Sequence, residues 1–226
     1  MSRKSPETPS WYPTVQGDLL SRVNLFRWIR DWARVHEIDD FDYFEFGVLN
    51  GESVVEAIRQ LRGGGLRHVT GFDTFAGIPA LQEADAQSQA QAPSFAQGQY
   101  AGMSIEGVRS SILAATNFPN EQLSLVQGDF RESLERYKPS HVAGFPLVVH
   151  IDCDLYSSSV SALEWCAAVS GDGTWLLADD YWYYRGSSQR GQRRAINDVL
   201  AHHPRVEITP YCNYKGSGRA FIINLK

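Results

Sequence analysis

Short apolar runs and amphipathic segments alternate along most of the chain. The runs have the length and composition of buried strands, and they cover residues 43–48, 67–73, 122–128, 146–152 and 174–180. The segments that follow them repeat their apolar residues at helical spacing, and they cover residues 53–61, 104–116, 130–137, 157–169 and 189–202. Strands that alternate with helices in this way predict a mostly parallel sheet with helices on both faces.

The two ends of the chain depart from this alternation. Near the N-terminus, Asp18 is placed to cap a helix that runs to about Ile38. Near the C-terminus, the runs "RVEITPY" and "GRAFIINL" are separated only by "CNYKGS", which is too short for a parallel crossover and therefore predicts an antiparallel hairpin. The pattern thus predicts one Rossmann-like, doubly wound α/β domain over residues 1–226, with residues 1–40 as an N-terminal helical cap.

The composition fits a single globular domain and argues against several classes of protein. Hydrophobic residues make up 43% of the 226 positions, enough for a substantial core. A net charge of −5 with scattered basic residues argues against a nucleic-acid surface, and no apolar run reaches the roughly 20 residues of a membrane span. The N-terminus lacks the apolar segment of a secretion signal, and the cysteines show no paired spacing. We therefore expect a cytoplasmic protein that binds neither nucleic acid nor membrane.

Two of the predicted strands end on pairs of aspartates. The stretches "HIDCDLY" (150–156) and "ADDY" (178–181) each come at the end of an apolar run, where a carboxylate needs a compensating charge. Ligands of doubly wound folds bind outside the carboxyl ends of the strands, and carboxylates clustered there favour a hard cation such as Mg²⁺. The alternative for Asp179 and Asp180 is that both are solvated loop residues.

The first predicted strand leads into a turn with two glycines. In "EFGVLNGES" (45–53), Gly47 and Gly51 allow a tight turn and a close approach of the backbone to a ligand at the start of the next helix. The alternative is a plain strand-to-helix turn. Glu45 lies within the apolar strand itself, so it needs a partner such as an electropositive ligand or an amino group.

Acids also follow the second and third predicted strands. Asp73, in "GFDTFAGIP" (71–79), either accepts hydrogen bonds from the hydroxyls of a ribose or forms a turn. In "QGDF" (127–130), Asp129 and Phe130 could hold an adenine by one hydrogen bond and one apolar face, and Asp129 could equally cap the following helix. Turn glycines, a ribose acid and an adenine pair, in this order along the strand ends, favour a nucleoside-containing cofactor.

These motifs together resemble those of a known family. In order, they are "FEFGVLNGES", "GFDTFAGIP", "SIEGVRSSI", "VQGDFRESL", "HIDCDLYSSS" and "ADDY", and they span roughly residues 40–185. They are similar to the motifs of the macrocin-type O-methyltransferases, which use S-adenosylmethionine and a divalent metal. The resemblance implies a class I methyltransferase fold and methyl transfer to a hydroxyl of a small molecule, such as a sugar or a natural product.

The resemblance also implies roles for individual residues. It implies Mg²⁺ held by Asp152, Asp179 and Asp180. The residues expected to bind the cofactor lie in the turns after the first three strands: Glu45, Gly47, Gly51, Ser53, Asp73, Thr74, Gly128, Asp129 and Phe130. Asp152, or a hydroxide on the metal, is expected to take the proton of the acceptor hydroxyl, and His150 on the same face of the strand is the competing base.

Two segments and two rival functions complete the predictions. Residues 80–102 are long and poor in apolar side chains, as in a lid or a disordered insertion, and "WYY" (182–184) could form an aromatic wall or simply pack. Trp11 and Tyr12 could close the site or form a contact in a homo-oligomer. A nicotinamide-dependent oxidoreductase is disfavoured by the missing GxGxxG motif, and a non-catalytic cofactor-binding protein by the intact acids.

Overall fold

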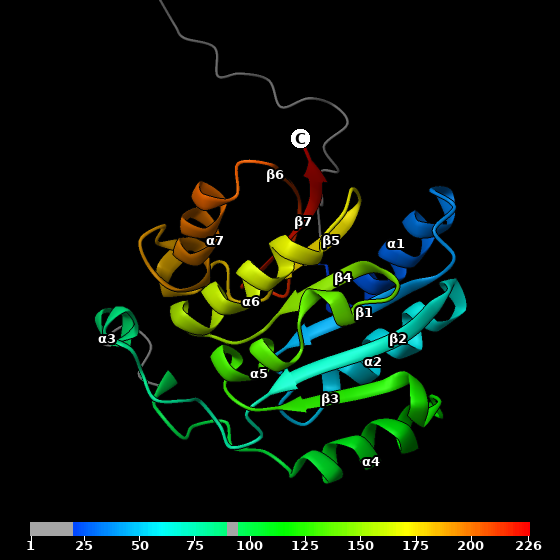
Figure 1. Cartoon of the computed structure of the whole chain (residues 1–226), viewed down its shortest axis with the longest axis horizontal. Helices are drawn as coiled ribbons and strands as arrows, with labels where there is room; N and C mark the ends of the chain where they lie inside the picture. Colours follow the sequence, from blue (N-terminus) through cyan, green and yellow to red (C-terminus); the bar gives the residue numbers. More distant parts are fainter. Residues whose placement is uncertain (1–19, 90–94) are drawn as a thin grey trace, which may run out of the picture.

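Within residues 20–89 and 95–226, the part of the chain that the computed structural model describes, a seven-stranded sheet forms the centre (Figure 1). Its order is β3-β2-β1-β4-β5-β7-β6. The strands are β1 (Phe41–Phe46), β2 (Leu66–Asp73), β3 (Leu123–Gln127), β4 (Phe145–Ile151), β5 (Thr174–Ala178), β6 (Val206–Tyr214) and β7 (Gly218–Leu225). Strands β1 to β5 are parallel, whereas β7 runs antiparallel to both β5 and β6. The predicted fold class, including the C-terminal hairpin, is confirmed.

Helices cover both faces of this sheet (Figure 1). One face packs against α1 (Arg22–Val35), α2 (Glu52–Leu61) and α4 (Ile105–Thr116), and the other against α5 (Phe130–Arg136), α6 (Tyr156–Val169) and α7 (Gly191–His202). Short 3₁₀ turns lie at Arg62–Gly64, Asn120–Gln122, Pro139–His141 and Tyr184–Gly186. A central strand covered on both sides has no solvated face, which is why all of β1 is buried. None of the helices in the described part of the chain combines the length and the apolar character needed to span a membrane.

Helix α1 begins later than the sequence pattern predicts. Its N-cap is Ser21, whose hydroxyl accepts the amide of Asn24 at 3.2 Å. The predicted cap, Asp18, lies outside the described residues, as do Trp11 and Tyr12 and the rest of residues 1–19 of the predicted helical cap. Serine is as good an N-cap as aspartate and stands directly before the apolar stripe. That stripe packs against the sheet through Leu25, Phe26, Ile29 and Ala33.

The segment 80–102 contains a helix that is tied to the core. Residues 90–94 lie outside the described part, and α3 (Glu83–Gln89) precedes them. Asp85 is only 3% exposed, and its carboxylate accepts the backbone amide of Ser157 at 3.0 Å and the hydroxyl of Ser157 at 2.6 Å. The N-cap residue of α6, Leu155, offers no side-chain cap of its own. Asp85 therefore caps α6 from a distant part of the chain.

Replacement of Asp85 should destabilise the fold because the first turn of α6 loses its acceptor. We expect Asp85→Ala to lower the free energy of unfolding by about 1–3 kcal/mol, the range for a lost cap with buried donors. Urea unfolding of the full chain measures this change. Glu83→Ala is the matched control, since Glu83 is an exposed acid in the same helix. Equal stability of the two variants would contradict the capping role.

Candidate active site

A cavity of about 430 Å³ opens at the carboxyl ends of the parallel strands. The chain runs from β1 outward to β3 and then crosses back to β4, so the sheet reverses its order between β1 and β4. Such a reversal leaves a crevice at the strand ends, which is where doubly wound folds bind ligands. The lining includes residues from the ends of the first five strands and from the β6–β7 turn, among them Gly47, Asp73, Asp129, Asp152, Asp180 and Lys215.

The two glycines after β1 are required by the backbone. Gly47 has φ +95°, and a Cβ there would overlap the carbonyl oxygen of Asp152 at the end of β4. Gly51, at φ +82°, is the N-cap of α2, and a Cβ there would press on the side chain of Ile112. Both positions therefore favour glycine, and the amides that begin α2 stay open toward the cavity.

Asp73 holds the loop between β1 and α2. Its Oδ2 accepts the amides of Val48 at 2.7 Å and Leu49 at 2.9 Å, and its Oδ1 accepts the amide of Phe75 at 2.8 Å. Thr74, also predicted to contact the cofactor, donates to the carbonyl of Gly77 at 2.6 Å. Asp73 and Thr74 both line the cavity. The turn-forming role of Asp73 is thus present, and contact with a ribose stays a prediction.

The turn after β3 contains a helix cap that also faces the cavity. Asp129 is the N-cap of α5, accepts the amide of Arg131 at 2.9 Å and forms an ion pair with its guanidinium. The hydrogen bonds from Arg131 lower the pKa of Asp129. Phe130 is buried edge-on against Phe46, with ring centroids 5.4 Å apart. Gly128 adopts φ +136°. The capping role is confirmed, and an adenine contact stays a prediction.

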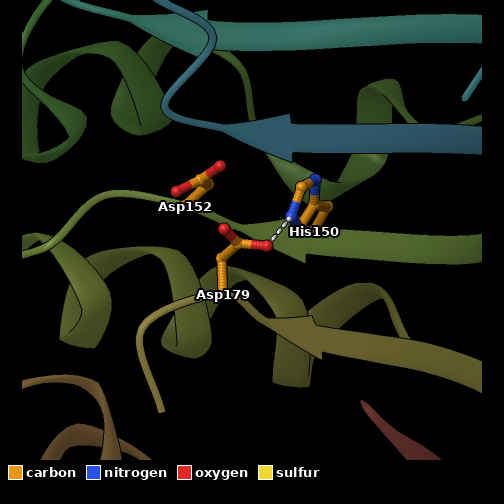
Figure 2. A group of neighbouring side chains, drawn as sticks. All are labelled: His150, Asp152 and Asp179. Carbon is orange, nitrogen blue, oxygen red and sulfur yellow. Dashed lines mark hydrogen bonds and ion pairs between the residues drawn. The ribbon is translucent and has the colours of Figure 1, made fainter. Parts of the chain in front are cut away.

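Three side chains at the ends of β4 and β5 come together as a possible cation site. The donor atoms of His150, Asp152 and Asp179 all lie within 4.8 Å of one another, and Figure 2 shows one oxygen of Asp179 directed toward His150 and the other toward Asp152. Asp179 is buried and pairs with His150 Nε2 at 3.1 Å and with the ammonium of Lys215. Asp152 is partly exposed and lies 3.6 Å from a guanidinium nitrogen of Arg22.

Two further aspartates, Asp180 and Asp154, line the cavity with Asp152, whereas Asp179 lies behind the lining. Asp180, the third predicted metal ligand, is buried and accepts the amide of Asp154 at 3.2 Å, and it is not part of the three-residue cluster. Asp154 precedes α6 but does not cap it, because Leu155 occupies the N-cap position. Asp154 instead lines the cavity with φ +59°. A positive φ at a non-glycine residue is uncommon and marks a backbone held in place by its surroundings.

The four aspartates lie close enough together to shift one another's pKa values. Burial and the charges of neighbouring carboxylates raise the pKa values of Asp152 and Asp180, and they raise the pKa of Asp154 to about 7. Burial also opposes ionisation of Asp179, but the hydrogen bond and charge of His150, together with Lys215, lower its pKa. Carboxylates that repel one another in this way are ionised together only when a further cation joins them.

Glu45 is separated from the cavity although it was predicted to contact the cofactor. It is fully buried and accepts the hydroxyls of Tyr43 and Ser53, and it is not among the residues that line the cavity, whereas Ser53 is. The Tyr43 hydroxyl also lies 3.0 Å from Nδ1 of His150. Burial alone would lower the pKa of His150, but the hydrogen bonds to Asp179 and Glu45 outweigh it and raise the pKa to about 10.

Sequence reasoning missed Arg22 and Lys215, whose positively charged side chains lie beside the aspartates of the site. Arg22 is the first residue of α1 and pairs with Glu56 of α2 at 2.7 Å. Lys215 lies in the β6–β7 turn, next to the strand-like contact between Leu20 and Tyr214. Neither residue belongs to a motif. Only the packing of α1 on α2 and the position of the hairpin beside β5 bring them to the site.

Comparisons with known proteins show the family and the fold of the chain. A model of the macrocin O-methyltransferase (TylF) family matches residues 7–207. The structure of the O-methyltransferase NovP gives a TM-score of 0.69 at 20% sequence identity, with 91% of this chain and 80% of that chain covered. The calicheamicin methyltransferase CalS11 gives 0.68 at 21% identity, with 90% and 80% covered.

A third structure is TomG from Streptomyces achromogenes, an O-methyltransferase of tomaymycin synthesis in complex with S-adenosylmethionine. It gives a TM-score of 0.53 at 14% identity, with 89% of this chain and 78% of that chain covered. At these identities the three structures show the fold that this chain shares with them. No curated protein sequence matches the chain.

The close approach of Gly47 to the end of β4 can be tested by adding a methyl group. Gly47→Ala should lower the free energy of unfolding by more than about 3 kcal/mol, because overlap with a backbone carbonyl adds to the cost of the left-handed conformation. Gly98→Ala is the matched control, since Gly98 also has a positive φ but open space around a Cβ, so it should lose only about 1–2 kcal/mol. If denaturant unfolding gives the two variants the same loss of free energy of unfolding, the close contact between Gly47 and Asp152 does not exclude a side chain.

Proposed function

The chain belongs to the macrocin O-methyltransferase family, and we propose that it transfers the methyl group of S-adenosylmethionine to a hydroxyl of a small molecule with the help of a divalent cation. The observation that carries this proposal is the composition of one cavity. A loop with two required glycines and Asp73 forms one part of its lining, and aspartates from the ends of β4 and β5 form another. A cofactor and a deprotonated acceptor could therefore meet in the same space.

The cofactor side is formed by the turns after β1, β2 and β3. Gly47 lines the cavity, and Gly51 begins α2, whose first amides have no intrahelical partners and could face a ligand. Asp73 fixes the loop by accepting three backbone amides, and about one of the roughly four acceptor sites of its carboxylate is left for a ribose hydroxyl. Asp129 and Phe130 line the cavity beside it, where an adenine would lie. In support, TomG was solved with S-adenosylmethionine on the same fold.

The acid side fits a hard divalent cation. Its donors are carboxylate oxygens, and burial and the neighbouring carboxylates raise the pKa values of Asp152 and Asp180, an effect that a bound cation would oppose. Asp152, Asp179 and Asp180 would hold the ion, which when bound lowers the pKa of a hydroxyl beside it. His150 is not needed as a ligand, because both of its ring nitrogens already face protein partners.

A carboxylate, not His150, is proposed to take the proton of the acceptor. A general base must be unprotonated and within hydrogen-bonding reach of its substrate. His150 is fully buried, has a pKa raised to about 10 and does not line the cavity. Asp152 lines the cavity and is partly exposed. Burial and neighbouring carboxylates raise its pKa, but a bound cation would keep it ionised, so we propose Asp152 as the base. Asp154 also lines the cavity.

The acceptor is proposed to bind against an aromatic wall. Phe95 and Tyr100, from the segment 80–102, line the cavity together with Tyr183. The rings of Phe95 and Tyr183 lie 4.7 Å apart, so this segment and the "WYY" stretch meet at the site. Aromatic faces suit the apolar face of a sugar or a ring of a natural product. CalS11 is described as a TDP-rhamnose 3'-O-methyltransferase, which supports a sugar hydroxyl as the acceptor.

The ribose contact of Asp73 can be separated from its role in the loop. Asp73→Ala should weaken binding of S-adenosylhomocysteine by about 1.5–3 kcal/mol, the range for hydrogen bonds to a charged group, as measured by calorimetry. The 2'-deoxy analogue of the same ligand should lose less affinity, because it lacks one of the hydroxyls in question. Equal losses for both ligands would assign Asp73 to the loop alone, and wild-type affinity would remove it from the site.

The metal requirement can be tested by removing and restoring the ion. We expect a chelator to abolish methyl transfer to a panel of glycosylated acceptors, to leave affinity for S-adenosylmethionine nearly unchanged, and added Mg²⁺ to restore turnover. Asp152→Asn and Asp179→Asn should be close to inactive even in excess metal. Asp31→Asn, an exposed acid on α1, is the control and should keep full activity. Turnover that persists in chelator would refute the metal role.

A further inference from the structure

A chain of buried polar side chains crosses the sheet beneath the cavity. It starts at the hydroxyl of Ser53 on α2, passes through the carboxylate of Glu45 and the hydroxyl of Tyr43 on β1, and reaches His150 on β4. Nε2 of His150 then contacts Asp179 Oδ1 at 3.1 Å, beyond the end of β5. Ser53 is 6% exposed, and each of the other members is at most 1% exposed.

The position of Glu45 in this chain follows from the register of the sheet. Glu45 is paired with His150 across β1 and β4, and the two side chains approach to 3.5 Å. One carboxylate oxygen accepts the Ser53 hydroxyl, and the other faces Tyr43 and His150. A buried carboxylate destabilises the fold unless each of its oxygens accepts a hydrogen bond or faces a positive charge, and both oxygens of Glu45 are engaged by protein groups. Glu45 can therefore influence the site only through the protein groups that it contacts.

The neighbour through which Glu45 acts is His150. The imidazole lies between Tyr43 and Glu45 on one side and Asp179 on the other, and the ring of Phe26 packs edge-on against it at 6.3 Å. With both nitrogens engaged and the ring packed, the imidazole has one orientation. Its contact with Asp179 Oδ1 holds one oxygen of that carboxylate, and the ammonium of Lys215 holds the other, Oδ2. Figure 2 shows that the oxygen not bonded to His150 points toward Asp152.

We propose that Tyr43, Glu45 and His150 are positioning residues that hold the Asp179 carboxylate in the orientation a divalent cation requires. This inference rests on the metal role in the proposed function. Partners that orient a metal ligand in this way govern metal affinity although they never touch the ion. The three residues are also absent from the cavity lining, so they have no direct contact with cofactor or acceptor.

The test is the affinity of the full chain for Mn²⁺, measured by electron paramagnetic resonance without acceptor. Tyr43→Phe removes one hydroxyl and keeps the ring in the core. We expect Mn²⁺ binding to weaken about 10-fold or more, while affinity for S-adenosylhomocysteine and the melting temperature stay close to wild type. Tyr137→Phe is the matched control, because its hydroxyl lies 3.4 Å from Thr70 in the other hydrophobic cluster. It should leave Mn²⁺ binding unchanged.

A second pair of variants tests His150 itself. His150→Gln keeps an N–H donor for Asp179 and should retain most of the Mn²⁺ affinity, whereas His150→Leu removes the donor and should lose about 10- to 100-fold. Wild-type Mn²⁺ affinity in both Tyr43→Phe and His150→Leu would overturn the inference. So would a parallel loss of Mn²⁺ affinity, cofactor affinity and melting temperature, which indicates a purely structural role. A wild-type chain that binds no Mn²⁺ would instead refute the metal role itself.

Discussion

Negative charge concentrated at the ends of two central strands is the constraint on which much of this structure depends. Four aspartates lie in the space where β4 and β5 end, and most of their surface is removed from water. Such a group is stable only if positive charge is brought to it from elsewhere. Arg22 of α1, His150 of β4 and Lys215 of the C-terminal hairpin provide that charge. Elements far apart in the sequence are thus held at one point by electrostatics as well as by packing.

The order of the strands supplies the other half of the site. Because the chain reverses between β1 and β4, the loop after β1 lies directly against the end of β4, and Gly47 has no room for a side chain beside Asp152. The loop after β1 therefore lies in direct contact with the backbone that carries the aspartates after β4. This closeness suits a reaction in which a methyl group passes directly from a donor to an acceptor oxygen, since reaction rate depends on how closely the reacting groups are held.

The sequence predicted what depends on local pattern and chain order. Strands buried on both faces read as apolar runs, and the rule that ligands bind at strand ends directed attention to Asp73, Asp129, Asp152 and Asp179. Local pattern could not show that Asp85 caps a helix 72 positions away or that Lys215 reaches Asp179. These contacts depend on how helices and strands pack against one another after they have formed. For the same reason the sequence could not identify the partners of Glu45, which come from α2 and β4 as well as from β1.

The hairpin that carries Lys215 has a consequence for how this protein is made. A chain leaving the ribosome presents β4 and β5 before Lys215 emerges, so the acids of the site exist for a time without their C-terminal counter-charge. Strand β7, which also pairs with β6, must then add beside β5 and antiparallel to it to complete the sheet. Closure of the sheet and neutralisation of Asp179 become one late step in biogenesis, and a nascent chain arrested before that step would hold an open sheet edge beside a cluster of unbalanced charge.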